Sequence, residues 1–231
     1  MRITWFGHSA FKLEFGGKGL LFDPFITGSG YPGGIEDAAR GVTHILLTHG
    51  HSDHVGDTVE IAKRTGATLI SSFEIVSWLQ EQGVEKIEPM NTGGSIRLDG
   101  FTASLTQAFH SSGELVNGVW AQLGHPNGII VKAEGEPTVY HLGDTGLFGD
   151  MKLINEIYKP KIVFVPIGDR FTMGARTAAY AVNNLFDFDV VVPCHYATFG
   201  LLDQSADDFR SQVTRASTKV VVPERGAAFE A

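Results

Sequence analysis

The segment HGHSDH, from His49 to His54, constrains this chain more than any other feature. Four side chains able to bind metal fall within six residues, directly after the apolar run Thr43–Thr48 and before a segment with helical spacing of apolar residues. A turn between a buried strand and a helix lets His49 and His51 point to one place while Asp53 and His54 turn toward an adjacent one. The two sets of side chains imply two metal ions. The alternative, a polar loop with incidental histidines, is disfavoured by this spacing.

The kinds of ligand indicate which metals suit the site. Imidazoles with carboxylates favour Zn²⁺, Mn²⁺ or Fe²⁺ over Mg²⁺ and Ca²⁺, which prefer shells of oxygen alone. We expect two divalent ions, Zn²⁺ first among these candidates. Two such ions lower the pKa of a bridging water, from 15.7 to about 7 at single-zinc sites, and so supply hydroxide as nucleophile. Asp53 is expected to act both as a ligand and as the acceptor of the proton.

Charge and hydropathy limit the partners of the chain. Its 18 Lys and Arg stand against 26 Asp and Glu, a formal net charge of −8, whereas proteins that bind long nucleic acids need a basic face. The N-terminal residues lack an export-signal pattern, and no run approaches the roughly 18 apolar residues of a membrane span. We therefore expect a cytoplasmic protein that contacts neither long nucleic acids nor membrane. The low charged fraction, 19%, is compatible with a homo-oligomer.

The pattern of apolar segments predicts one α/β domain over residues 1–231, because strands and helices alternate without a linker. Each half runs from a β-rich to a βα-rich segment, although the residues do not repeat. The expected strands are Ile3–Phe6, Phe11–Phe15, Leu20–Phe22, Thr43–Thr48, Thr68–Ser71, Ser95–Leu98, Phe101–Ala108, Val119–Leu123, Ile129–Ala133, Thr138–His141, Ile162–Pro166, Val190–Pro193 and Lys219–Val222. The expected helices are Asp53–Arg64, Glu74–Glu81, Met151–Tyr158, Ala175–Phe186 and Ala206–Arg215, with the glycine-rich stretch Thr27–Gly34 as a loop.

The histidine motif resembles the signature of the metallo-β-lactamase superfamily. The opening WFGHS from Trp5, the Phe22-Asp23-Pro24 turn and the stretch Pro166–Gly174 resemble, more narrowly, a group of short metal-dependent hydrolases related to ascorbate-6-phosphate lactonase. This similarity covers essentially the whole chain. It implies a four-layer αβ/βα sandwich, in which two mixed sheets flanked by helices pack face to face and hold the metals at one edge.

The resemblance also implies the remaining metal ligands. Three later apolar strands are each followed by a suitable side chain: His110, Asp144 and His195. The family pattern places one ion on His49, His51 and His110, a second ion on Asp53, His54 and His195, and Asp144 between the two. All seven positions are filled, which favours an active dinuclear site.

The function implied is hydrolysis of an ester-type bond, a phosphoester, lactone or amide, in a small molecule by a metal-bridging hydroxide. Two ions would bring four positive charges against two ligand carboxylates, so a small anionic substrate is compatible with the acidic chain. The alternatives are an iron-binding redox protein and a non-catalytic metal-binding module on the same fold. The sequence has no room for the flavodoxin domain of related oxygen reductases, and its complete ligand set disfavours a non-catalytic module.

Two further residues are candidates for supporting the ligands. Asp23, at the end of a strand, could accept a hydrogen bond from a ligand imidazole or simply form a turn capped by the next proline. His8 is expected to donate to substrate or to support a ligand, rather than to lie on the surface.

Three candidates lie on later loops. His141 could orient Asp144, although a buried histidine with its hydrogen bonds satisfied is the favoured interpretation. Asp169 and Arg170 follow a strand at the edge where ligands gather in α/β proteins. Arg170 is either an anchor for an anionic substrate group or part of a structural ion pair.

Overall fold

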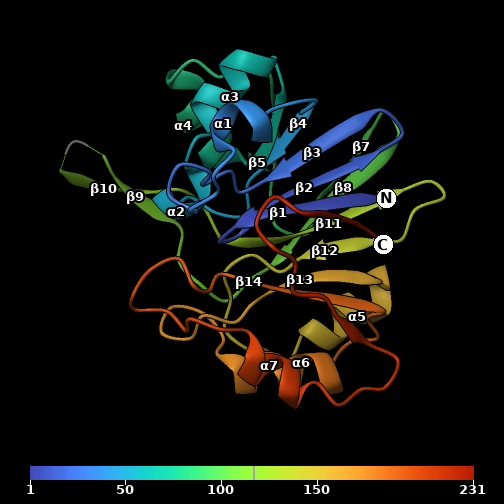
Figure 1. Cartoon of the computed structure of the whole chain (residues 1–231). Helices are drawn as coiled ribbons and strands as arrows, with labels where there is room; N and C mark the ends of the chain where they lie inside the picture. The colour runs from blue at the N-terminus through green and yellow to red at the C-terminus, as the bar shows by residue number, and fades with distance from the viewer. Residues whose placement is uncertain (117) are drawn as a thin grey trace.

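Two large mixed sheets face each other in the computed structural model, which describes residues 1–116 and 118–231 (Figure 1). The first sheet has the order β16-β1-β2-β3-β4-β5-β6, antiparallel from β16 to β3 and parallel from β3 to β6. Its strands are β1 (Arg2–Gly7), β2 (Ala10–Phe15), β3 (Lys18–Phe22), β4 (His44–Leu46), β5 (Thr68–Ser72), β6 (Ile87–Met90) and β16 (Ala228–Glu230).

The second sheet repeats this arrangement with the second half of the chain. Its order is β15-β14-β13-β12-β11-β8-β7, antiparallel from β7 to β12 and parallel from β12 to β15. Its strands are β7 (Ser95–Leu98), β8 (Phe101–Gln107), β11 (Asn127–Ala133), β12 (Val139–His141), β13 (Ile162–Pro166), β14 (Val190–Cys194) and β15 (Lys219–Val220). A separate hairpin, β9 (Gly113–Val116) and β10 (Val119–Gln122), projects from the body of the molecule.

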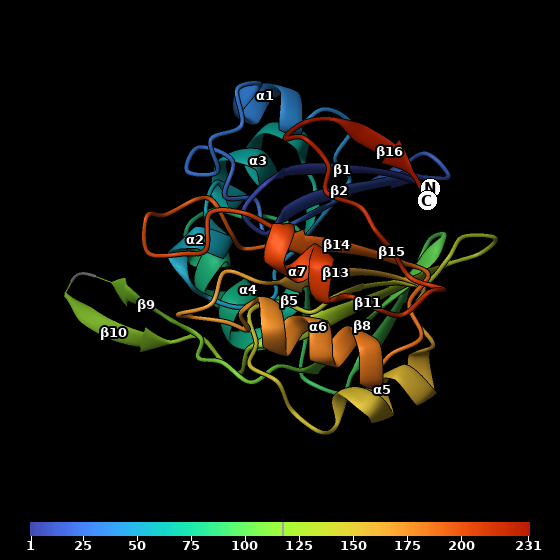
Figure 2. The same ribbon diagram turned by 60° about the horizontal axis from the view of Figure 1, so that its bottom comes forward.

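Helices form the two outer layers, as a second view also shows (Figure 2). Helices α1 (Gly34–Ala38), α3 (Thr58–Thr65) and α4 (Phe73–Glu81) cover the first sheet, and α5 (Met151–Tyr158), α6 (Ala175–Asn184) and α7 (Asp207–Gln212) cover the second. The short α2 (Ser52–Val55) lies beside one end of the first sheet. The predicted fold of two mixed sheets flanked by helices is therefore confirmed. Among the described residues, no helix has the length and apolar composition needed to cross a bilayer.

Side chains alternate in direction along each strand, which explains why each sheet packs against the other sheet on one face and against helices on the other. On β1, Trp5 belongs to the apolar cluster between the sheets, whereas the next residue, Phe6, belongs to the cluster beneath the first set of helices. The rings of Phe11 on β2 and Phe164 on β13 stack with their centroids 3.8 Å apart, which joins the two sheets directly. Burial of this apolar surface is the main favourable contribution to folding.

The structure corrects the single helix predicted over Asp53–Arg64. Gly56 has a φ of 40°, outside the helical region, so the segment divides into α2 and α3. The backbone N–H of Asp57 leaves the helical pattern and donates to the carbonyl of Pro24, 2.8 Å away. Helix α1 and strands β6, β9 and β16 were not predicted, and the last predicted helix is shorter than expected.

Strand direction brings the candidate residues to one edge. Given the pairing above, β1, β3 and β4 run the same way in the first sheet, as do β8, β12 and β14 in the second. Each of these six strands is followed by at least one candidate: His8, Asp23, the motif from His49 to His54, His110, Asp144 and His195.

Candidate metal centre

Asp144 lies in the middle of the site. Its Oδ2 is 2.9 Å from His195 Nε2 and 3.3 Å from His54 Nε2. The same oxygen is 3.6 Å from His110 Nε2 and 4.0 Å from His49 Nε2. These four imidazoles come from three different loops. One carboxylate oxygen thus lies close to histidines that follow strands of both sheets. Such an arrangement suits a carboxylate that bridges two cations.

The other ligand atoms form two groups around Asp144. His49, His51 and His110 form one group, in which His49 Nε2 and His51 Nδ1 are 2.9 Å apart. Asp53, His54 and His195 form the second, together with His8, with all four ligand atoms within 4.8 Å of one another. The structure thus brings together all seven side chains expected as ligands, in the two expected sets.

Unpartnered atoms indicate that this donor set fits metal ions. Asp144 Oδ1 and His54 Nε2 are buried and have no hydrogen-bond partner within the described residues. Burying polar atoms without partners costs free energy, which a bound cation would offset. Imidazole and carboxylate donors gathered at this spacing are also the ligand types of Zn²⁺ sites.

Burial and charge shift the pKa values of the site in opposite directions. Burial lowers the pKa of the His49 imidazole well below its usual range. Burial also disfavours the charged form of His195, but the carboxylates of Asp144 and Asp53 outweigh it and raise the pKa of His195 to about 9. His54 behaves in the same way, with its pKa held well above the usual range. The two carboxylates therefore attract positive charge to this part of the site.

Asp23 supports the ligands from behind. Its Oδ2 lies 2.7 Å from His54 Nδ1, and its two oxygens accept hydrogen bonds from the backbone N–H and hydroxyl of Thr48, at 2.8 and 2.7 Å. Asp23 is fully buried with a φ of 41°. A carboxylate bound to the far nitrogen of a ligand histidine fixes the tautomer and orientation of that ring. Of the two roles considered for Asp23, these contacts support the first.

His8 is fully buried rather than on the surface. Its Nε2 lies 3.0 Å from Asp53 Oδ2, and its Nδ1 lies 3.1 Å from Thr198 Oγ1. Burial lowers the pKa of His8 to about 4. His8 therefore steadies Asp53, and it lies close enough to the second group to be counted with it.

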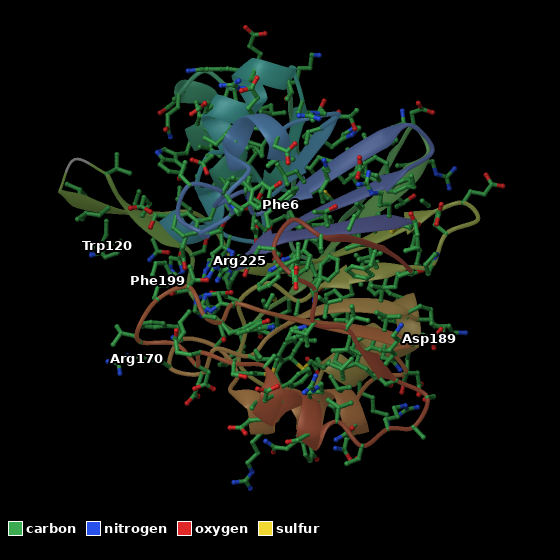
Figure 3. All side chains as sticks on the ribbon, in the orientation of Figure 1. Phe6, Trp120, Arg170, Asp189, Phe199 and Arg225 are labelled. Carbon is green, nitrogen blue, oxygen red and sulfur yellow. The ribbon has the colours of Figure 1, made fainter. Side chains whose placement is uncertain are left out.

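The other three candidates lie outside the ligand cluster. His141 is buried, accepts the Gly143 N–H at 2.9 Å and donates to the Ser9 carbonyl at 3.0 Å, so its hydrogen bonds are satisfied. Asp169 and Arg170 are exposed. Figure 3 shows the Arg170 side chain at the outer edge of the molecule.

A pocket of about 320 Å³ opens onto the ligands. Five of its lining side chains belong to the expected metal ligands, and the other three do not. The lining residues are His51, Asp53, His110, Asp144, His195, Ser111, Phe171 and Phe199. Ser111 Oγ is 3.3 Å from His51 Nε2.

Sequence reasoning missed the supporting hydroxyls and the aromatic side chains of the pocket. Thr48 had a local signal, since it directly precedes the motif. Ser111 and Phe171 also had one, since Ser111 follows His110 and Phe171 lies in the stretch Pro166–Gly174. Thr198 and Phe199 were not singled out by any such motif.

A model of the beta-lactamase superfamily domain matches residues 2–195. The chain belongs to the metallo-β-lactamase superfamily. Within this superfamily, a UPF0173 metal-dependent hydrolase from Methylocella silvestris is 53% identical over 227 residues, covering 98% of both chains. Another from Methylobacterium nodulans is also 53% identical, covering 99% of this chain and 98% of its own. This superfamily member is accordingly a metal-dependent hydrolase, as predicted.

Solved structures agree on the superfamily fold. Igni18, a metallo hydrolase from Ignicoccus hospitalis, is 39% identical, with a TM-score of 0.88, and covers 99% of this chain and 98% of its own. An isothiocyanate hydrolase from Delia radicum gut bacteria is 20% identical, with a TM-score of 0.78 and coverage of 100% and 98%, and shares the fold. The narrower relation to ascorbate-6-phosphate lactonase stays a prediction.

Proposed function

We propose that this metal-dependent hydrolase has a dinuclear centre and cleaves an ester-type bond, a phosphoester, lactone or amide, in a small molecule. The position of Asp144 carries the proposal. One of its oxygens lies within 4.0 Å of four imidazole nitrogens that belong to two separate groups. A single-metal site would need neither a shared carboxylate nor a second group of ligands.

The proposed assignment gives each ion three ligands of its own. One ion would be held by His49, His51 and His110 and the other by Asp53, His54 and His195, with Asp144 available to both. We propose Zn²⁺ as the ion, with Mn²⁺ or Fe²⁺ as the other candidates. When bound, such ions supply a water of lowered pKa and polarise the oxygen of the scissile group.

The chain's own residues position the reactants and handle the proton. Asp53 lines the pocket and is held at Oδ2 by His8, so its carboxylate would accept the proton that the attacking water loses. Hydrolysis adds the hydroxyl of water to the acyl carbon or phosphorus and breaks the bond to the leaving oxygen or nitrogen. The leaving group then takes up one proton, which Asp53 is placed to return.

The substrate is proposed to be a small molecule rather than a nucleic acid. The pocket volume of about 320 Å³ lies at the lower end of the range of small-molecule sites. The net charge of −8 opposes binding of long polyanions.

Metal analysis by plasma emission tests the proposal, combined with hydrolysis assays on a bis(p-nitrophenyl) phosphate, a lactone and an anilide. We expect close to two zinc ions per chain, turnover of at least one substrate, and loss of that turnover on chelation with recovery on adding Zn²⁺. One ion per chain at saturation would contradict the dinuclear centre. Iron, oxygen consumption and no hydrolysis would overturn the reaction class in favour of redox chemistry.

A further inference from the structure

Two phenylalanines dominate the part of the pocket that the expected metal ligands do not form. Of the three other lining residues, two are Phe171 and Phe199, and the third is Ser111. Phe171 is 52% exposed and Phe199 is 38% exposed. Exposed apolar side chains beside a set of convergent polar groups are a feature of small-molecule sites.

Phe199 is held in place by aromatic neighbours. Its ring makes an edge-to-face contact with His8, at 5.4 Å between centroids, and lies 6.0 Å from the ring of Phe25. Since His8 contacts Asp53, the wall that Phe199 provides is continuous with the ligand cluster. Phe199 therefore provides an apolar surface in the pocket that also contains Asp53 and His195.

Phe171 is presented by a strained loop. A bridge between Gly168 and Gly174 closes the loop, and Asp169 and Arg170 both have positive φ, at 57° and 42°. Non-glycine residues rarely adopt this region, and such strain is concentrated at functional sites. The result is that Phe171 lines the pocket while Arg170 is exposed at the outer edge of the molecule (Figure 3).

The side chains of the pocket offer no lysine or arginine anchor to an anionic substrate group among the described residues. The described residues that line it are those given above, and none of them is a lysine or arginine. The Arg170 guanidinium lies 5.9 Å from the Phe171 ring but is not part of the lining. Asp53 and Asp144 both line the pocket and would partly offset the charge of bound metal ions. A carboxylate or phosphate away from the scissile bond would therefore find no lysine or arginine to pair with among the described lining residues.

We propose that the substrate carries an uncharged, planar apolar group, such as an aryl ring, next to its scissile bond, and that Phe171 and Phe199 bind this group. The proposal rests on the hydrolytic metal centre proposed above and narrows the sequence-based expectation, which was compatible with an anionic substrate. Aromatic rings gain both apolar burial and favourable ring contacts at such a surface.

Hydroxamates test the proposal without relying on turnover, because they bind metal ions directly. Binding of acetohydroxamate, benzohydroxamate and 4-carboxybenzohydroxamate to the zinc-loaded protein is measured by calorimetry. We expect benzohydroxamate to bind at least tenfold more tightly than acetohydroxamate, and the carboxylated compound to bind at least threefold more weakly than benzohydroxamate. Phe171→Ala and Phe199→Ala should each lower the benzo-to-aceto affinity ratio at least threefold.

Leu153→Ala is the matched control, since Leu153 is an equally exposed apolar side chain on α5, 53% exposed, outside the pocket lining. It should leave the ratio unchanged. Equal affinities for benzohydroxamate and acetohydroxamate, a ratio insensitive to both phenylalanine replacements, or tighter binding of the carboxylated compound would each overturn the aryl proposal. Failure of the zinc-loaded protein to bind any of the three compounds would likewise overturn the aryl proposal, whereas failure of the protein to take up zinc, measured by plasma emission, would overturn the metal centre itself.

Discussion

Asp23 contacts His54 but is not a member of either group of expected metal ligands. Its carboxylate is buried between the hydroxyl and N–H of Thr48 on one side and the His54 imidazole on the other. The ring of His54 is thereby fixed with Nε2 directed toward Asp144. One residue outside the motif thus orients the side chain of a residue inside it that we propose as a metal ligand.

Asp23→Asn should weaken metal binding by about 10- to 100-fold, the usual cost of losing a carboxylate that orients a ligand histidine. The amide keeps the size of the side chain but removes the charge that favours the His54 N–H. Competition with a chromophoric chelator measures the affinity. Asp99→Asn is the control. Asp99 is an exposed carboxylate that pairs with Lys18 and belongs to neither group of expected ligands. Equal affinity in Asp23→Asn and wild type would disprove the role.

His44 is a partly buried histidine away from the expected metal ligands, and burial changes the pKa of its imidazole. It begins β4, with Nδ1 2.8 Å from the Thr43 hydroxyl and its ring edge-on to Phe101 at 5.0 Å. Burial, aided by the nearby Lys18 charge, lowers the pKa of His44 from its ordinary 6.5. The unfolded chain therefore takes up this proton at a higher pH than the folded chain.

Stability should accordingly fall as pH drops below about 6.5, because in that range the unfolded state binds more protons at His44. The His44→Asn variant removes this contribution. The unfolding free energy of wild type minus that of the variant should thus be more positive at pH 8 than at pH 5.5, as measured by urea denaturation. An NMR titration of the His44 ring gives the sign directly, and a pKa above 6.5 would contradict the argument.

At the scale of elements, the break between α2 and α3 ties the histidine motif to the loop after β3. Gly56 allows the turn, Asp57 N–H donates to the Pro24 carbonyl, and the Asp57 carboxylate accepts from the N–H and hydroxyl of Thr27. The two segments that carry Asp23 and His54 are therefore held together by their backbones as well as by their side chains.

Gly56→Ala should lower the free energy of unfolding by about 1–3 kcal/mol and weaken metal binding. A Cβ there would lie 2.6 Å from the Pro24 carbonyl oxygen, in addition to the strain of a φ of 40°. Gly93→Ala is the matched control, since Gly93 also has positive φ, at 88°, but a Cβ would meet nothing within 4 Å. Denaturant melts and metal titrations compare the two. The same metal affinity in both variants would show that the break does not position the ligands.

The sequence predicted most strands of both sheets, because their apolar runs are short and bounded by turn residues. It could not predict that α2 ends after one turn, since the apolar spacing of the segment continues past Gly56 while the break depends on the distant Pro24 carbonyl. The short α1 begins at Gly34, where the predicted glycine-rich loop Thr27–Gly34 ends.

At the scale of the whole molecule, the site was far more predictable than its surroundings. The motif from His49 to His54 is continuous in sequence, and its resemblance to a known family supplied His110, Asp144 and His195. The pocket walls were not predicted in this way, because Phe171 and Phe199 are not metal-binding side chains and so did not stand out as site candidates. Their loops follow the neighbouring strands β13 and β14 of the second sheet, which place them beside Asp144 and His195.

The apolar core joins the two halves of the chain independently of the metal centre. Residues of the first sheet, such as Leu13, share one buried cluster with residues of the second, such as Val163, and with α6. We propose on this basis that residues 1–231 fold as a single unit that does not need metal ions for its global stability.

His51→Ala tests that proposal together with the ligand assignment. The variant should lose most of its bound metal, because one ion loses a ligand. Its hydrolytic activity should fall by at least about 100-fold. Calorimetry should still show one unfolding transition, at a temperature close to that of chelator-treated wild type, since bound ligands stabilise only by mass action. His125→Ala is the control, a histidine outside both ligand groups. Two separate transitions, or a loss of secondary structure in His51→Ala by circular dichroism, would show that the centre holds the halves together and that the core alone does not.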